Sequence, residues 1–218
     1  MDRPLRRTTL RDEIKDRIVE RIFNGTYGPG DRIVESQVAT EFGTSQAPVR
    51  EALRELEALR FVETRPHRGA RVREVTTEEL GQIYPVRAAL EEIAGREAAV
   101  RMSEEQLSAL ADELAGMRQA AEAQDLHTQL LHDVRFHEII VEASGNQVLV
   151  EVWRSLRVEA RTLISAIRAD SDLRMIAEMH RTVLEALQSR DPELAGKEMR
   201  AHIEFFGSVV APRPEDHD

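Results

Sequence analysis

Three histidines and one aspartate have the residue types and positions to hold a metal ion. His137, His180 and His202 each lie within an apolar stripe of helical spacing, and each stripe belongs to a different expected helix. Asp133 precedes His137 by four residues, so the two side chains share one helix face. Because a buried carboxylate without a partner is strongly destabilised, Asp133 requires a cation nearby. We therefore predict a site for a divalent metal, Zn²⁺ best, with Ni²⁺, Mn²⁺ or Fe²⁺ also suited to these donors.

Two further residues are candidates for binding a small molecule beside this metal. Arg87 lies on an apolar stripe and points inward, where a guanidinium next to a metal suits a small carboxylate. The alternative is a structural ion pair between Arg87 and Glu91, one helical turn later. Asn146 either caps the helix that follows it, which its position favours, or contacts a bound water. We predict an effector site that includes Arg87 and Asn146.

The residues after Val75 must supply the helices that position these side chains. Their apolar periodicity is helical to the end of the chain, with capping signals at Thr76, Ser103 and Asp191 and no strand pattern. The expected architecture is an all-α bundle of six helices. These helices are expected over residues 77–101, 104–123, 126–143, 147–168, 171–189 and 192–210.

The first third of the chain has a different pattern, three helices followed by a β-hairpin. A stripe at every fourth position predicts the first helix, and a Gly-containing turn separates a short second helix from a third that Ser45 can cap. This order is that of a winged helix-turn-helix, which makes the whole chain mainly α. The expected elements are helices over residues 10–24, 35–42 and from 46 onward, and strands over residues 61–64 and 70–73 joined by a turn.

The third helix and the hairpin tip carry candidates for DNA contacts. A recognition helix places its N-terminal residues at base edges in the major groove, where Gln can bind adenine and Arg can bind guanine through two hydrogen bonds. The hairpin tip can reach the minor groove or the phosphates. For Arg50 the alternative is pairing with acidic neighbours on a solvated helix face. The predicted DNA-contacting residues are Ser45, Gln46, Arg50, His67, Arg68 and Gly69.

The charge distribution separates two domains. The formal net charge is −10, but residues 1–75 hold 15 basic and 13 acidic residues, whereas residues 76–218 hold 15 basic and 27 acidic ones. We therefore expect a DNA-binding domain over residues 1–75 and an effector-binding, metal-binding and dimerising domain over residues 76–218. The absence of Cys excludes disulfides, thiolate zinc sites and a cysteine nucleophile. No apolar run approaches the roughly 20 residues that span a bilayer, so a cytoplasmic protein is expected.

The N-terminal motifs resemble those of GntR-type bacterial regulators. The resemblance implies a winged helix that binds operator DNA. Two positions depart from the family pattern, because Gln46 stands where Arg is common and Ser36 where a basic residue is frequent, so the family's usual operator is not implied. The matching motifs are Ser45-Gln46-Ala47-Pro48-Val49-Arg50-Glu51-Ala52-Leu53, Leu56-Glu57, Gly25-x-x-x-Pro29-Gly30 and Arg68-Gly69-Ala70-x-Val72.

Residues 78–210 resemble the FCD effector domain of the FadR-like group of these regulators. Many FCD domains bind a divalent metal through one Asp and three His, so the resemblance implies the same four ligands as the helix pattern. It also implies that Arg87 faces the effector pocket. The matching residues are Arg87-Ala88-Ala89-Leu90-Glu91, Asp133-x-x-Phe136-His137, Ser144-Gly145-Asn146, His180 and His202.

The sequence thus predicts a DNA-binding transcriptional regulator without catalytic residues, acting as a repressor in the family's commoner mode. Its expected partners are double-stranded operator DNA, a small carboxylate effector and a second copy of the chain, because palindromic half-sites require a two-fold pair of readers. One alternative is a metal-dependent hydrolase or lyase fused to a DNA-binding appendage, although no general base is evident beside the site. A second alternative is a purely structural zinc.

Overall fold

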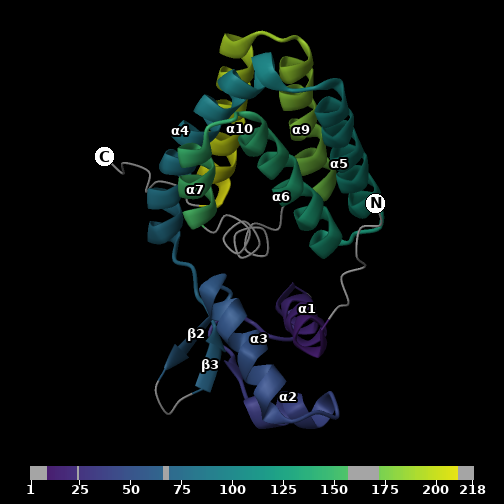
Figure 1. Cartoon of the computed structure of the whole chain (residues 1–218), viewed down its shortest axis with the longest axis vertical. Helices are drawn as coiled ribbons and strands as arrows, with labels where there is room; N and C mark the ends of the chain where they lie inside the picture. Colours follow the sequence, from purple (N-terminus) through teal and green to yellow (C-terminus); the bar gives the residue numbers. More distant parts are fainter. Residues whose placement is uncertain (1–8, 24, 66–68, 157–171, 211–218) are drawn as a thin grey trace, which may run out of the picture. The chain divides into compact units, whose positions relative to one another are not determined.

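In a computed structural model, which describes residues 9–23, 25–65, 69–156 and 172–210, the chain divides into two units, Met1–Glu74 and Val75–Asp218. The first unit is coloured purple to blue in Figure 1, and the second runs from teal to yellow. No described helix is both long enough and apolar enough to cross a membrane.

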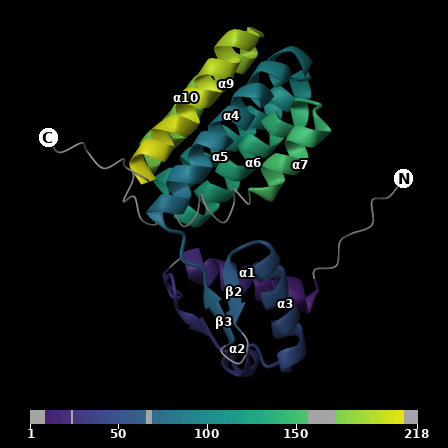
Figure 2. The same cartoon turned by 90° about the vertical axis from the view of Figure 1, so that its left-hand side faces the viewer.

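The N-terminal unit consists of helices and a small antiparallel sheet, which are seen from a second direction in Figure 2. Strand β3 lies in the centre of the sheet and pairs with β1 on one side and β2 on the other. The elements are α1 (Leu10–Phe23), β1 (Arg32–Ile33), α2 (Glu35–Glu41), α3 (Gln46–Ala58), β2 (Val62–Arg65) and β3 (Gly69–Val72).

This unit confirms the predicted winged helix-turn-helix and differs from the prediction in three details. The sequence does not predict β1, because two residues are too short to show periodicity. Both hairpin strands are displaced by one residue from their expected bounds, with Val62 paired to Val72. Ser45 occupies the N-cap position of α3, but its side chain makes no capping hydrogen bond.

The core of the N-terminal unit forms where α1 packs against α3. The predicted stripe of α1 is buried at Ile14, Ile18 and Ile22, whereas Leu10, at its start, is 48% exposed. The apolar face of α3 packs on α1 in this core. The opposite face of α3 is therefore left to solvent. The buried residues of α3 are Val49, Ala52, Leu53 and Leu56.

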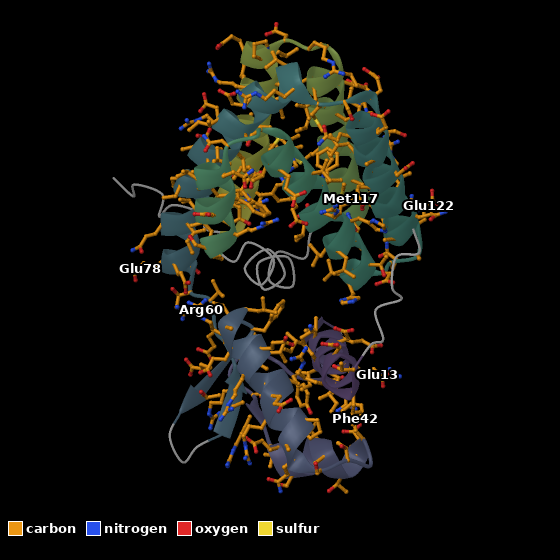
Figure 3. The ribbon with its side chains drawn as sticks, viewed as in Figure 1. Glu13, Phe42, Arg60, Glu78, Met117 and Glu122 are labelled. Carbon is orange, nitrogen blue, oxygen red and sulfur yellow. The ribbon has the colours of Figure 1, made fainter. Side chains whose placement is uncertain are left out.

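The C-terminal unit is helical throughout its described part, and each of the six predicted helices has a counterpart there. The predicted stretch over residues 157–168 lies outside the described residues. In Figure 3, Met117 is a fully buried side chain of α5, whereas Glu122 lies on the surface at the end of that helix. The helices are α4 (Thr77–Arg101), α5 (Glu104–Glu122), α6 (Leu126–Ala143), α7 (Gln147–Ser155), α9 (Leu173–Gln188) and α10 (Pro192–Val210).

The capping signals set the helix starts. Ser103 and Gln106 form the complete capping box at the start of α5. The Thr76 side chain accepts a hydrogen bond from the backbone of Glu79 at the start of α4. Asp191 Oδ1 accepts hydrogen bonds from the first backbone N–H groups of α10. These caps fix where each helix begins, and therefore which of its residues face the core.

Helices α4 and α10 lie side by side in Figures 1 and 2, and Gly95 is a point of close approach between them. A Cβ added at Gly95 would lie 2.9 Å from the backbone oxygen of Ala195 and 2.8 Å from Met199 Cγ. At Gly196, on the facing helix, an added Cβ would meet only the side chain of Arg96. The first contact is with fixed backbone and the second with a flexible side chain.

We expect Gly95→Ala to destabilise the C-terminal unit. Overpacking costs about 1–3 kcal/mol, which exceeds the roughly 1 kcal/mol by which alanine surpasses glycine as a helix former. Gly196→Ala is the comparison variant and should cost less, because the Arg96 side chain can adopt another rotamer whereas the Ala195 backbone cannot. Urea unfolding followed through Trp153, the single tryptophan, measures both variants. Equal stability of Gly95→Ala and wild type would contradict the close approach.

Candidate metal centre and DNA-reading surface

Three histidines from three helices converge in the core of the C-terminal unit. His137 on α6, His180 on α9 and His202 on α10 are buried, and one ring nitrogen from each lies within 4.8 Å of the other two. The ring centroids of His180 and His202 are 4.3 Å apart, and those of His137 and His202 are 5.1 Å apart. Burial of the apolar stripe of each helix carries its histidine inward.

Aromatic side chains close two sides of this histidine group. The Phe136 ring stands edge-on to His180, with centroids 5.1 Å apart. The Phe206 ring packs against His202 at the same distance. These rings exclude water from two sides of the group, so the histidine nitrogens depend on partners within the protein for their hydrogen bonds.

The hydrogen bonds of His137 and His180 leave Nε2 of each ring directed at the group. His180 Nδ1 lies 2.9 Å from the carbonyl oxygen of Ile176, which only accepts, so the proton belongs on Nδ1. His137 Nδ1 lies 2.6 Å from Glu91 Oε2, which places its proton on Nδ1 in the same way. In the neutral ring, Nε2 then carries a lone pair. His137 Nε2 faces His202 Nε2 at 3.3 Å.

Asp133 stands at one side of the histidine group. Its Oδ1 is 3.0 Å from His180 Nε2, but these two atoms are not aligned as a hydrogen bond. Its Oδ2 is buried and has no hydrogen-bond partner among the described residues. The set of mutually close ligand atoms consists of the three histidines, so Asp133 adjoins this set rather than completing it.

The pKa values of Asp133 and His202 favour the protonation states of metal ligands. Burial opposes the charge of Asp133, but its close contact with His180, together with the charges of His137 and Arg87, holds its pKa below the usual value. Burial lowers the pKa of His202 well below its usual value, and His180, His137 and Arg87 lower it further. At neutral pH the group therefore contains a carboxylate and at least one neutral imidazole.

Glu91 is a site residue that the sequence reasoning missed, since it entered only as a possible partner of Arg87. It is fully buried on α4 and joins side chains from three helices. Its Oε1 accepts hydrogen bonds from Arg87 Nε at 2.6 Å and from Trp153 Nε1 at 2.8 Å, while Oε2 contacts His137. Burial disfavours its charge, but Arg87 and His137 hold the pKa of Glu91 far below its usual value. Its place on the inward stripe was the available signal.

Arg87 and Asn146 have different surroundings. Arg87 is buried, and its ion pair with Glu91 is the alternative raised from the sequence. Asp133 is among the charges that favour the charged form of Arg87 and raise its pKa, so the guanidinium is electrostatically linked to the histidine group. Asn146 is exposed, and its Oδ1 caps α7 by accepting from the backbone of Leu149. Effector contact by Asn146 therefore stays a prediction.

The donor set fits a divalent cation. His180 Nε2 and Asp133 Oδ1 are two acceptors that face each other at 3.0 Å when His180 is neutral with its proton on Nδ1. A cation among these atoms would remove that repulsion and would be offered the lone pairs of the three histidines. In the metal-free alternative, an added proton on His180 satisfies its contact with Asp133, and a neutral His202 with its proton on Nε2 donates to His137 Nε2 at 3.3 Å.

The start of α3 presents the predicted DNA-reading residues. Ser45, Gln46 and Arg50 are all exposed at this end of the helix. Arg50 does not pair with its neighbours on α3: its Nε and Nη2 donate to Glu35 Oε2 on α2, at 3.0 and 2.8 Å. The Arg50 side chain is 52% exposed, so its guanidinium is accessible to solvent even though it is paired with Glu35, the first residue of α2.

The predicted contacts at the hairpin tip are only partly described. His67 and Arg68 lie outside the described residues. Gly69 begins β3 with a φ of +75°, and an added Cβ would lie 3.6 Å from Nε of Arg32. Glycine at this position therefore serves the left-handed backbone of the turn, because a side chain there would be strained.

Each of the two units matches a known protein family. Residues 10–72 match the family described as bacterial regulatory proteins, gntR family, and residues 82–205 match the FCD domain. The probable D-xylose utilization operon transcriptional repressor of Paenarthrobacter nicotinovorans is 37% identical, over 95% of this chain and 91% of its own. The gluconate operon transcriptional repressor of Bacillus licheniformis is 26% identical, over 84% and 78%.

A solved structure shows the same fold. E. coli McbR/YncC superposes with a TM-score of 0.75 at 24% identity, over 94% of this chain and 98% of its own. The matched families and relatives are regulators rather than enzymes, so the hydrolase or lyase alternative has no support. The chain belongs to the GntR family of DNA-binding transcriptional regulators, in the group that carries a C-terminal FCD domain.

Proposed function

We propose that this protein is a transcriptional repressor whose operator binding is controlled by a small carboxylate bound at a metal site in the helical unit. The observation that carries the proposal is the convergence of three buried histidines from three helices, with Asp133 Oδ1 facing His180 Nε2 at 3.0 Å. Repression is supported by two relatives that are named as transcriptional repressors, one of a D-xylose utilization operon and one of a gluconate operon.

The proposed ligands are Asp133, His137, His180 and His202, with zinc as the favoured metal. When bound, the metal would supply a positive centre that can accept a carboxylate oxygen. Arg87 adds a buried positive charge that is electrostatically linked to the same group. An anionic effector that reaches both charges would connect α4 with the three histidine helices. The helical unit would then favour one arrangement of the two DNA readers over another.

We propose that the helical unit also forms a homodimer in the cytoplasm. An exposed apolar stripe on α4 supports self-association, because Val86, Ile93 and Val100 recur every seven residues and are 48%, 46% and 61% exposed. Seven-residue spacing puts the three side chains on one side of the helix. A pair of chains would present two winged helices to the half-sites of a palindromic operator.

Metal analysis of the purified protein tests the site. We expect near-stoichiometric metal in wild type and its loss in both His180→Ala and His202→Ala, because each variant removes a ligand contributed by a different helix. His132→Ala is the matched control: His132 also lies on α6, but it is half-buried and pairs with Glu113 outside the group, so metal should be retained. Elemental analysis together with thermal unfolding separates metal loss from misfolding.

Two results would overturn the proposed metal site or its role. Wild-type protein that takes up no metal after reconstitution with Zn²⁺, Ni²⁺ or Mn²⁺ would make the histidine group a proton-sharing polar core. Metal that is held tightly while a panel of small carboxylates, gluconate included, leaves operator binding unchanged would indicate a closed structural zinc.

Arg50→Ala should weaken operator binding. Loss of a bidentate contact to guanine costs about 1–3 kcal/mol, roughly 5- to 150-fold in Kd. Gel-shift titration with the DNA upstream of the protein's own gene measures this loss. Arg17→Ala is the control, because Arg17 is an exposed arginine of α1 whose ion-pair partner, Glu20, lies on the same helix. Equal weakening in both variants would point to nonspecific charge effects rather than base reading by Arg50.

A further inference from the structure

A single buried carboxylate, that of Glu91, connects the histidine group to two other helices. Glu91 is 0% exposed and lies on α4, while its partners lie on α6 and α7 and on the previous turn of α4. Each of its two oxygens has a distinct set of contacts. The arrangement of donors around these oxygens determines where the proton of His137 must lie.

Oxygen Oε1 of Glu91 is committed to two groups that can only donate. Arg87 Nε donates at 2.6 Å and the indole Nε1 of Trp153 at 2.8 Å. Neither a guanidinium nor an indole N–H can reverse its role at this oxygen. The guanidinium also stabilises the carboxylate in its charged form, although it is buried.

Oxygen Oε2 therefore remains to accept from His137 Nδ1, at 2.6 Å. An ionised carboxylate has no proton to give, so Nδ1 must carry one. The neutral ring of His137 then has its lone pair on Nε2, the nitrogen that faces His202. Without this contact, the ring could carry its proton on Nε2 and present no donor to a metal there.

We propose that Glu91 is a positioning residue, which fixes the tautomer and ring orientation of His137 so that Nε2 is available to a metal ion. This inference rests on the proposed metal site and adds a residue outside its ligand set. Glu91 acts through His137 and does not itself touch the metal. Carboxylates that orient ligand histidines in this way typically change metal affinity 10–100-fold when mutated.

Glu91→Gln is the sharpest test, because it keeps the shape and reverses one hydrogen bond. If the amide oxygen keeps Arg87 and Trp153, the amide NH₂ faces His137 Nδ1, which must then accept, and the proton moves to Nε2. We expect zinc affinity to fall about 10–100-fold in competition with a chromophoric chelator. In the metal-free protein, ¹⁵N spectra of labelled histidine should show His137 protonated on Nδ1 in wild type and on Nε2 in Glu91→Gln.

Two controls separate positioning from general destabilisation. Glu92→Gln changes the next residue, which is partly exposed and pairs with Arg96 and Arg200, so affinity and tautomer should match wild type. Trp153→Phe removes one donor from Oε1 but leaves Oε2 on His137, so the wild-type tautomer should persist. Thermal unfolding shows whether each variant is folded. If Glu91→Gln does not fold, the wild-type and Trp153→Phe spectra still test the assignment.

The outcomes distinguish this inference from the function on which it rests. Wild-type protein that binds no zinc would overturn both. Wild type that binds zinc, with Glu91→Gln binding equally well, would overturn the positioning role and leave the metal site intact. Metal-free wild type with the proton of His137 on Nε2 would overturn the role regardless of any variant.

Discussion

The central physical constraint on the helical unit is that charged and polar groups are buried among apolar helices. Such groups are tolerated only when each finds a partner of opposite character. Glu91 meets this requirement through Arg87, Trp153 and His137. The requirement also demands precise spacing, because a misplaced helix would leave a charge unpaired. Caps that fix the helix starts and the close approach at Gly95 hold α4 in the position that this network needs.

The same constraint is met incompletely around the histidine group. Asp133 Oδ2 and His202 Nδ1 have no hydrogen-bond partner among the described residues, and the acceptors Asp133 Oδ1 and His180 Nε2 lie 3.0 Å apart. The carboxylate of Glu91 therefore has all its hydrogen-bond partners, whereas that of Asp133, on a neighbouring helix, does not. An incompletely hydrogen-bonded carboxylate in a core is more typical of a binding site than of a purely structural contact. A ligand there would connect α6, α9 and α10 by direct bonds, whereas apolar packing alone would let them slide. This difference would allow a bound molecule to favour one arrangement of these helices over another.

Sequence patterns predicted the features that follow from periodicity and local capping. The stripes containing His137, His180 and His202 predicted convergence because burial of an apolar face determines the direction of everything on it. Features that depend on tertiary partners were missed. Strand β1 exists only because β3 offers it a neighbour, and Arg50 pairs with Glu35 on another helix. The role of Glu91 requires knowing that α4, α6 and α7 meet, which no pattern within a single helix contains.

The two arginines of interest illustrate how burial decides whether an ion pair can be exchanged. The Arg50–Glu35 pair is half exposed, and such pairs contribute about 0–1 kcal/mol. A base edge that offers two hydrogen bonds is worth about 1–3 kcal/mol, so a guanine would replace Glu35 as the partner of Arg50 with a net gain in free energy. The Arg87–Glu91 pair is almost completely buried, and breaking it would strand a charge. An effector would therefore act beside Arg87 only by adding to its contacts, whereas DNA would act on Arg50 by replacing them.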